Sequence, residues 1–200
     1  MKQSMVAAVV IVVLLFSGCG SSRSVQRVAA DSQTDLSGKW NETDARLVAE
    51  QMVDALTSRP WLKSFTAETG KKPTVIVGTV RNLTSEHIQT DIFVKDIERE
   101  LVNSGKVTFV ASKEERDEVR SERVDQQSNA SEETAKRLAA EAGADFMLRG
   151  SIKDLVDRVD GTETKFYQVD LELVNVETNV KAWMDSKKIK KVVERSGSSW

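Results

Sequence analysis

An unbroken two-residue alternation constrains the fold of this chain more than any other feature of its sequence. Over residues 167–173 each apolar residue is followed by a polar one, and the apolar positions are Tyr167, Val169, Leu171 and Leu173. Because successive side chains of a strand point to opposite faces, the pattern predicts a strand with one buried and one exposed face.

The neighbouring segments extend this strand into an antiparallel meander. The same alternation occurs upstream at Phe146, Leu148, Gly150 and Ile152. Asp160-Gly161 predicts a turn between these two strands. Residues 177–179 predict a second turn, which leads into a last strand over residues 180–192.

The first half of the domain mixes helical and strand patterns. A helix is expected from Thr43, as its N-cap, to Arg59-Pro60, and a second over residues 90–104 with Ile92 among its inward residues. Strands are expected over residues 75–80 and 106–111, and two more helices from Ser112 and from Ser131. The order α-β-α-β-α-α-β-β-β predicts an α/β (α+β) domain, with helices against one mixed sheet.

The N-terminus has the pattern of a bacterial lipoprotein signal. Met5–Phe16 is an uninterrupted apolar run. It is shorter than the roughly 20 residues that span a bilayer and fits the roughly 7–15 of a secretory signal. Ser17-Gly18-Cys19 then matches the lipobox, so we expect lipid on Cys19. An ordinary signal peptide with an incidental cysteine is the alternative.

These patterns divide the chain into four parts. We expect a signal peptide over residues 1–18, a flexible lipid-anchored tether over 19–34, a globular domain over 35–195 and a tail over 196–200. In a Gram-negative source, Gly20 in place of Asp indicates sorting to the outer membrane, with the domain facing the periplasm.

Composition gives no support to several classes of function. A net charge of −2 offers no general attraction to nucleic acid. Cys19 and His87 are the only cysteine and histidine, so we expect no metal site, no cofactor and no small-molecule substrate. Ser85, His87 and Asp91 lie close in sequence, but no G-x-S-x-G pattern surrounds any serine, and we expect no catalytic residues.

A set of ordered motifs resembles the LpoB family of outer-membrane lipoprotein activators of bifunctional penicillin-binding proteins. The motifs lie at residues 35–41, 75–84, 96–99, 103–110, 143–152 and 173–183. The resemblance implies a fold similar to the N-terminal domain of TolB and to CsgG. It also implies a monomeric, non-enzymatic protein that docks on a regulatory domain of a peptidoglycan synthase and shifts it toward active states.

The tether differs from that of the well-studied members. Those carry a long Pro-rich linker, whereas the only prolines here are Pro60 and Pro73, both within the expected domain. A structural or assembly lipoprotein of CsgG-like fold, with a different envelope partner, is therefore the main alternative. An envelope hydrolase is a third.

Exposure, rather than the resemblance, selects the candidate partner-binding residues. One group lies in the loop after the first strand and the other near the C-terminus: Asn82, Thr84, Glu86 and His87, and Lys187, Lys188, Lys190 and Lys191. His87 could instead be an ordinary surface residue. The lysines could instead mark a charged edge strand that discourages aggregation.

Overall fold

The computed structural model describes residues 24–29, 32–110, 115–117, 119, 121 and 143–194. The chain divides into two compact units, residues 1–32 and residues 33–200. In the first unit, the described residues form neither helix nor strand. Cys19, the expected signal peptide and the C-terminal tail lie outside the described residues.

The second unit is built on a five-stranded mixed sheet with the order β2-β1-β3-β4-β5. Its strands are β1 (Thr74–Asn82), β2 (Thr108–Phe109), β3 (Phe146–Val159), β4 (Thr162–Asn175) and β5 (Lys181–Glu194). β1 pairs in parallel with β2 and β3, whereas β3, β4 and β5 form an antiparallel meander. The expected α/β (α+β) class, mixed sheet and meander are confirmed.

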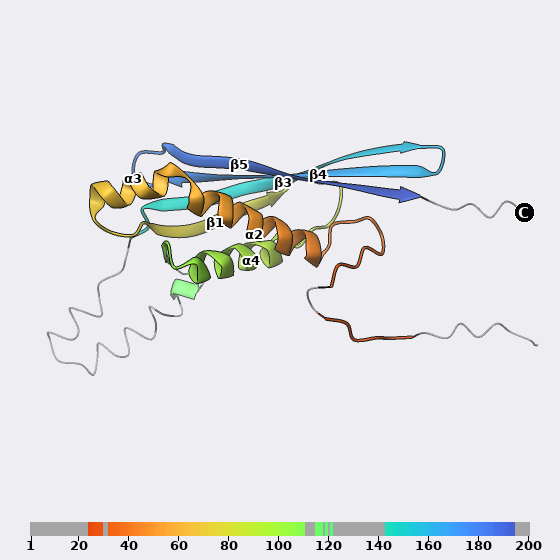
Figure 1. Ribbon diagram of the computed structural model, residues 1–200, viewed down its shortest axis with the longest axis horizontal. Helices are drawn as coiled ribbons and strands as arrows, with labels where there is room; N and C mark the ends of the chain where they lie inside the picture. Colours follow the sequence, from red (N-terminus) through yellow and green to blue (C-terminus); the bar gives the residue numbers. More distant parts are fainter. Residues whose placement is uncertain are drawn as a thin grey trace, which may run out of the picture. The chain divides into compact units, whose positions relative to one another are not determined.

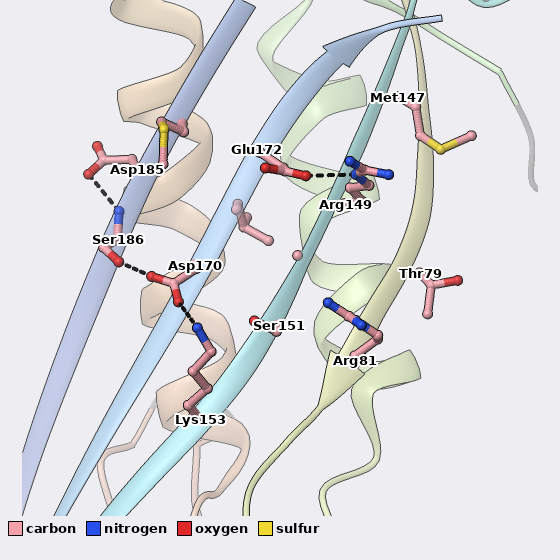
Figure 2. Close-up of a pocket in the computed structure, with 13 residues that line it drawn as sticks. Thr79, Arg81, Met147, Arg149, Ser151, Lys153, Asp170, Glu172, Asp185 and Ser186 are labelled. Carbon is pink, nitrogen blue, oxygen red and sulfur yellow. Dashed lines mark hydrogen bonds and ion pairs between the residues drawn. The ribbon is translucent and has the colours of Figure 1, made fainter. Parts of the chain in front are cut away.

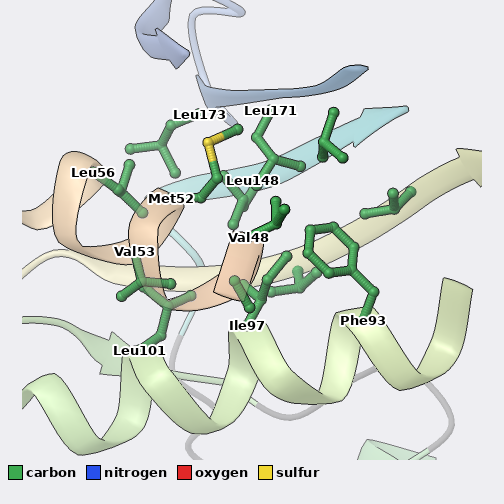
Figure 3. Packing of buried hydrophobic residues seen from close by; sticks show 14 of the residues in the cluster. Val48, Met52, Val53, Leu56, Phe93, Ile97, Leu101, Leu148, Leu171 and Leu173 are labelled. Atoms are coloured by element: carbon green, nitrogen blue, oxygen red, sulfur yellow. The ribbon is translucent and has the colours of Figure 1, made fainter. Parts of the chain in front are cut away.

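Helices cover one face of this sheet. They are α2 (Glu42–Ser58), α3 (Pro60–Thr69) and α4 (Thr90–Ser104), and α2 and α4 lie on the same side (Figure 1). Between them and the sheet lies the core, to which α2 contributes Met52 and Leu56, α4 contributes Phe93 and Ile97, and β4 contributes Leu171 (Figure 3). A fully buried side chain of this size stabilises the fold by about 1.5–3 kcal/mol.

Three details of the helices differ from expectation. Asn41, not Thr43, is the N-cap of α2, and it forms a capping box with Asp44. Pro60 does end α2, but it is also the first residue of α3, a position where its missing N–H costs nothing. Ile92 was expected to face inward, yet its side chain is 52% exposed, because the inward stripe of α4 runs through Phe93, Ile97 and Leu101.

The other differences concern length and coverage. β2 is only two residues long, whereas β3 extends past the alternating segment that predicted it and β5 ends at Glu194 rather than near residue 192. The expected helices from Ser112 and Ser131 fall largely outside the described residues. Of the first, residues 115–117, 119 and 121 are described and are helical.

Candidate functional site

The loop after β1 is held in place by its own polar side chains. The Asn82 side-chain amide donates to the Glu86 carbonyl at 2.7 Å, and the Thr84 backbone N–H and hydroxyl donate to Asn82 Oδ1 at 3.0 and 2.7 Å. Ser85 donates its backbone N–H and its hydroxyl to Asp154 on β3. Asn82 and Thr84, both candidate partner-binding residues, are therefore engaged inside the loop.

Glu86 points from this loop onto the helix-covered side of the sheet. Its Oε1 accepts hydrogen bonds from Lys165 Nζ at 2.6 Å and from the Tyr167 hydroxyl at 2.8 Å, and its Oε2 accepts from Trp40 N at 3.2 Å. Burial opposes ionisation of Glu86, but the bonds from Lys165 and Tyr167 outweigh it, so the pKa of Glu86 lies below its ordinary value. Burial and the bond to Glu86 raise the pKa of Tyr167.

A second buried cation holds the segment that enters the domain, residues 35–40, which we call the strap. Lys191 Nζ lies 2.6 Å from Asp35 Oδ1 and 2.6 Å from Asp44 Oδ2, and it donates to the Lys39 carbonyl at 3.0 Å. The hydrogen bond from Lys191 lowers the pKa of Asp35, whereas burial raises the pKa of Asp44. Lys191, a candidate partner-binding residue, thus fixes the strap to β5.

The strap also packs closely against the sheet and the helices. Gly38 has a φ of +65°, a backbone conformation that residues other than glycine rarely adopt. A Cβ at this position would also collide with Val193. The Trp40 ring makes edge-to-face contacts with Phe93 and Tyr167, with centroid distances of 6.2 and 5.7 Å. Residues 35–40 are therefore an integral part of the folded domain.

A cleft of about 400 Å³ lies between the strap, the loop and the β3–β4 hairpin. Its lining includes Lys39, Ser85, His87 and Arg158. His87 is exposed, and no hydrogen bond joins it to Ser85 or Asp91 within the described part of the chain. Ser85 instead donates to Asp154 at 2.6 Å, so the geometry of a Ser-His-Asp triad is not formed.

The opposite face of the sheet is not covered by the described helices, and it carries a ladder of charges (Figure 2). On this open face Arg149 Nε lies 2.7 Å from Glu172 Oε1, and Lys153 Nζ lies 2.9 Å from Asp170 Oδ2. Burial opposes ionisation of Asp170, but bonds from Ser186 and Lys153 lower its pKa. The bonds from Lys181 and Arg149 lower the pKa of Glu172.

The strand register divides the four candidate lysines between the two faces. Lys188 and Lys190 lie opposite Gln168 and Phe166, which face away from the helices. Lys187 and Lys191 lie opposite Val169 and Lys165, on the helix-covered side. β5 is an edge strand, so the lysines do lie on a charged edge. The exposure expected from the sequence did not distinguish Lys188 and Lys190, which are exposed, from Lys191, whose side chain is largely buried. The ion-pair partners of Lys191, Asp35 and Asp44, are distant in sequence.

Within the described residues, no cluster of three or more potential metal ligands is present. Nor does any described helix combine the length and the apolar character that crossing a bilayer requires.

The fold and these surfaces define a class of protein: an α+β domain whose mixed sheet is covered by helices on one face and presents charged residues on the other. A family profile described as "Peptidoglycan-synthase activator LpoB" matches residues 44–189. This chain therefore belongs to the LpoB family of peptidoglycan-synthase activators, and the resemblance found in the sequence motifs is confirmed.

Solved structures similar to this chain include members of the same family. The LpoB C-terminal domain from Escherichia coli is 17% identical with a TM-score of 0.45, over 74% of this chain and 99% of that one. The corresponding Salmonella enterica domain is 19% identical with a TM-score of 0.35, over 68% and 94%. Lipoprotein GNA1162 from Neisseria meningitidis is 12% identical with a TM-score of 0.37, over 63% and 88%. No curated protein matches the sequence.

Proposed function

We propose that this chain is a lipid-anchored, non-catalytic activator of a bifunctional penicillin-binding protein. Membership of a family of peptidoglycan-synthase activators carries the proposal. The lipobox at Cys19 supports an N-terminal lipid, and Gly20 supports placement at the outer membrane, facing the periplasm. As a monomer, the domain binds the active state of the synthase more tightly than the inactive state, and so raises the population of the active state.

The open face of the sheet supports docking better than the helix-covered side. Lys188 and Lys190 are exposed there, and neither has an ion-pair partner among the described residues. The charges of Glu86 and Lys191, in contrast, form ion pairs inside the domain. We therefore assign partner binding to Lys188 and Lys190. His87, exposed on the loop, forms a second candidate contact.

The length of the tether sets a condition on the partner. Residues 19–34 reach at most about 50 Å when fully extended. Because no long linker lies between Cys19 and Asp35 to cross the cell wall, contact with an inner-membrane synthase requires a thinner periplasm or a partner that reaches further toward the outer membrane. A different target is the remaining alternative.

Crosslinking in intact cells tests the proposal. A photoactivatable residue at position 188 of the full-length protein is expected to capture a bifunctional synthase, identified by mass spectrometry. The matched control is the same residue at position 63, because Lys63 is exposed on α3, away from the open face. Capture of other envelope proteins, with no synthase among them, would contradict the proposal.

One observation favours a second function, in assembly. The β3–β4 hairpin extends past α2 and α4 (Figure 1), and its open side exposes Leu155 (69%) and Val159 (62%). Exposed apolar residues can mediate contact between copies of a chain. The mass of the purified full-length protein in solution distinguishes the activator from the assembly protein. A monomer supports the activator, whereas a stable ring would contradict it.

A further inference from the structure

We propose that a groove on the open face of the sheet receives an acidic side chain of the partner protein, with Arg81 as its anchor. This inference deepens the proposed function, because it rests on docking at this face and specifies the chemistry of the partner segment. It adds a residue that exposure and family resemblance did not select.

The groove exists because long side chains surround a short one. Arg81, Ser151, Asp170 and Ser186 form one row across four strands of the sheet. The Ser151 side chain is small and the residue is only 7% exposed, so it forms a floor between longer neighbours such as Arg149 and Lys153. The resulting groove has a volume of about 870 Å³ and is open to solvent (Figure 2).

The charges within the groove leave Arg81 without a partner. Asp170 shares its row, but that carboxylate accepts hydrogen bonds from Lys153, Ser186 and Gln168. Glu172 is bound by Arg149 and Lys181. No ion pair or hydrogen bond of the Arg81 side chain lies among the described residues, and Arg81 is exposed. The guanidinium is therefore free to bind a carboxylate from outside, in the bidentate geometry that it favours.

The surroundings of Arg81 define what kind of segment fits. Met147, 36% exposed, and Met184, 68% exposed, also line the groove, and methionine side chains adapt readily to apolar partners. Asp170 and Glu172 disfavour a polyanion, because a nucleic acid or a phosphate-rich surface would place several negative charges beside them. A protein segment with a single carboxylate flanked by apolar residues matches both the unpaired guanidinium of Arg81 and the exposed methionines.

Substitution of Arg81 in the full-length protein tests the assignment. Because the Arg81 side chain has no polar contact among the described residues, Arg81→Gln is expected to leave the stability of the domain unchanged. Loss of a charge-assisted contact on the docking surface is expected to weaken binding to the captured synthase by about tenfold for Arg81→Gln, and further for Arg81→Glu. Lys63→Glu, an exposed cation replaced on α3, is the matched control and should bind as the parent does.

Two results separate this inference from the proposed function. If the parent binds a synthase and Arg81→Glu binds it equally well, the assignment of Arg81 is wrong while the activator role stands. If the parent binds no synthase, the activator role fails. Binding in the groove is then tested with a short peptide that carries one glutamate between leucines. The peptide is added to isotope-labelled protein, and the NMR signal of the Arg81 guanidinium reports binding.

The peptide experiment has its own decisive outcomes. A saturable shift that disappears with a glutamine version of the peptide, and in Arg81→Gln, supports a carboxylate site. Absence of a shift overturns the inference. So does an equal response to inorganic phosphate, because the groove would then bind anions in general rather than an acidic protein segment.

Discussion

Lys165 and Lys191 lie directly opposite each other on β4 and β5, and their side chains are only 8% and 9% exposed. Like charges facing each other across a strand pair repel, and this repulsion is stronger away from water. Lys165 pairs with Glu86 of the loop after β1, and Lys191 pairs with Asp35 of the strap and with Asp44 of α2. These ion pairs hold both segments against this end of the sheet.

The first prediction concerns the buried cation that holds the strap. Lys191→Met leaves the Asp44 carboxylate buried without its partner, so we expect a loss of about 3 kcal/mol in the free energy of unfolding. Urea unfolding measures it. Lys188→Met, on the exposed face of the same strand, is the control and should change stability by less than about 0.5 kcal/mol. Adding Asp44→Asn to Lys191→Met should recover part of the loss, and failure to recover any would argue against this ion pair.

The second prediction concerns pH. The folded-state pKa of Glu86 is lowered from 4.5, so the folded protein holds this proton less tightly than the unfolded chain. Its contribution is therefore complete above the unfolded pKa and is lost as pH falls through the folded pKa. We expect Glu86→Gln to cost about 1–3 kcal/mol near neutral pH, with a smaller difference from the parent near pH 3. Asp44, whose pKa is shifted the other way, is present in both proteins and cancels in the difference.

Urea unfolding curves of both proteins, measured from neutral pH down to about pH 3, give this difference in the free energy of unfolding at each pH. A difference between the parent and Glu86→Gln that stays constant down to the lowest pH would show that Glu86 is not ionised in its contact with Lys165.

The third prediction separates backbone strain from collision. Gly38→Ala and Gly70→Ala both place a side chain on a residue with positive φ, at +65° and +70°, but only the first also meets Val193. We expect Gly70→Ala to cost about 1 kcal/mol and Gly38→Ala about 1–2 kcal/mol more. In a Val193→Ala background the Gly38→Ala cost should fall toward that of Gly70→Ala. Thermal or urea unfolding of the four variants provides the comparison, and equal costs in both backgrounds would exclude the collision.

The fourth prediction concerns the lipid. Intact-mass spectrometry of the native protein should find a chain that begins at Cys19 and carries acyl chains, because two or three chains anchor a protein stably. Cys19→Ser should lose these chains and leave the membrane fraction. Ser17→Ala, which keeps a small residue in the lipobox, should be processed as the parent is. A bare thiol on the native protein would refute the anchor.

The sequence could predict those parts of the fold that depend on local periodicity. Tyr167, Val169, Leu171 and Leu173 are all buried on the helix-covered face, as their alternation required. Gly105 ends α4 in the left-handed conformation that favours glycine, and Asp160-Gly161 forms the turn between β3 and β4. α3 could not be predicted in the same way, because Pro60 is equally compatible with the end of one helix and the start of another.

The candidate site depends on contacts between residues that are far apart in the sequence, and it was therefore harder to predict from the sequence. Lys191 and Asp35 are 156 positions apart, so no local pattern reveals that this lysine is buried while Lys190 is exposed. The same holds for Arg81, which is distinguished only by the row of residues that the sheet places beside it. Face assignment along β5 required the register of the sheet.

The strap also determines how the domain responds to a pull from its N-terminal side. Asp35 is bound by Lys191 on the edge strand before the chain reaches α2 at Glu42. If the proposed lipid holds the N-terminus, a pull from that side acts first on the ion pair between Asp35 and Lys191 and on the packing of Trp40, before it reaches α2. Because the ion pairs of Lys191 lie on the helix-covered side, such a pull would not act directly on the open face of the sheet.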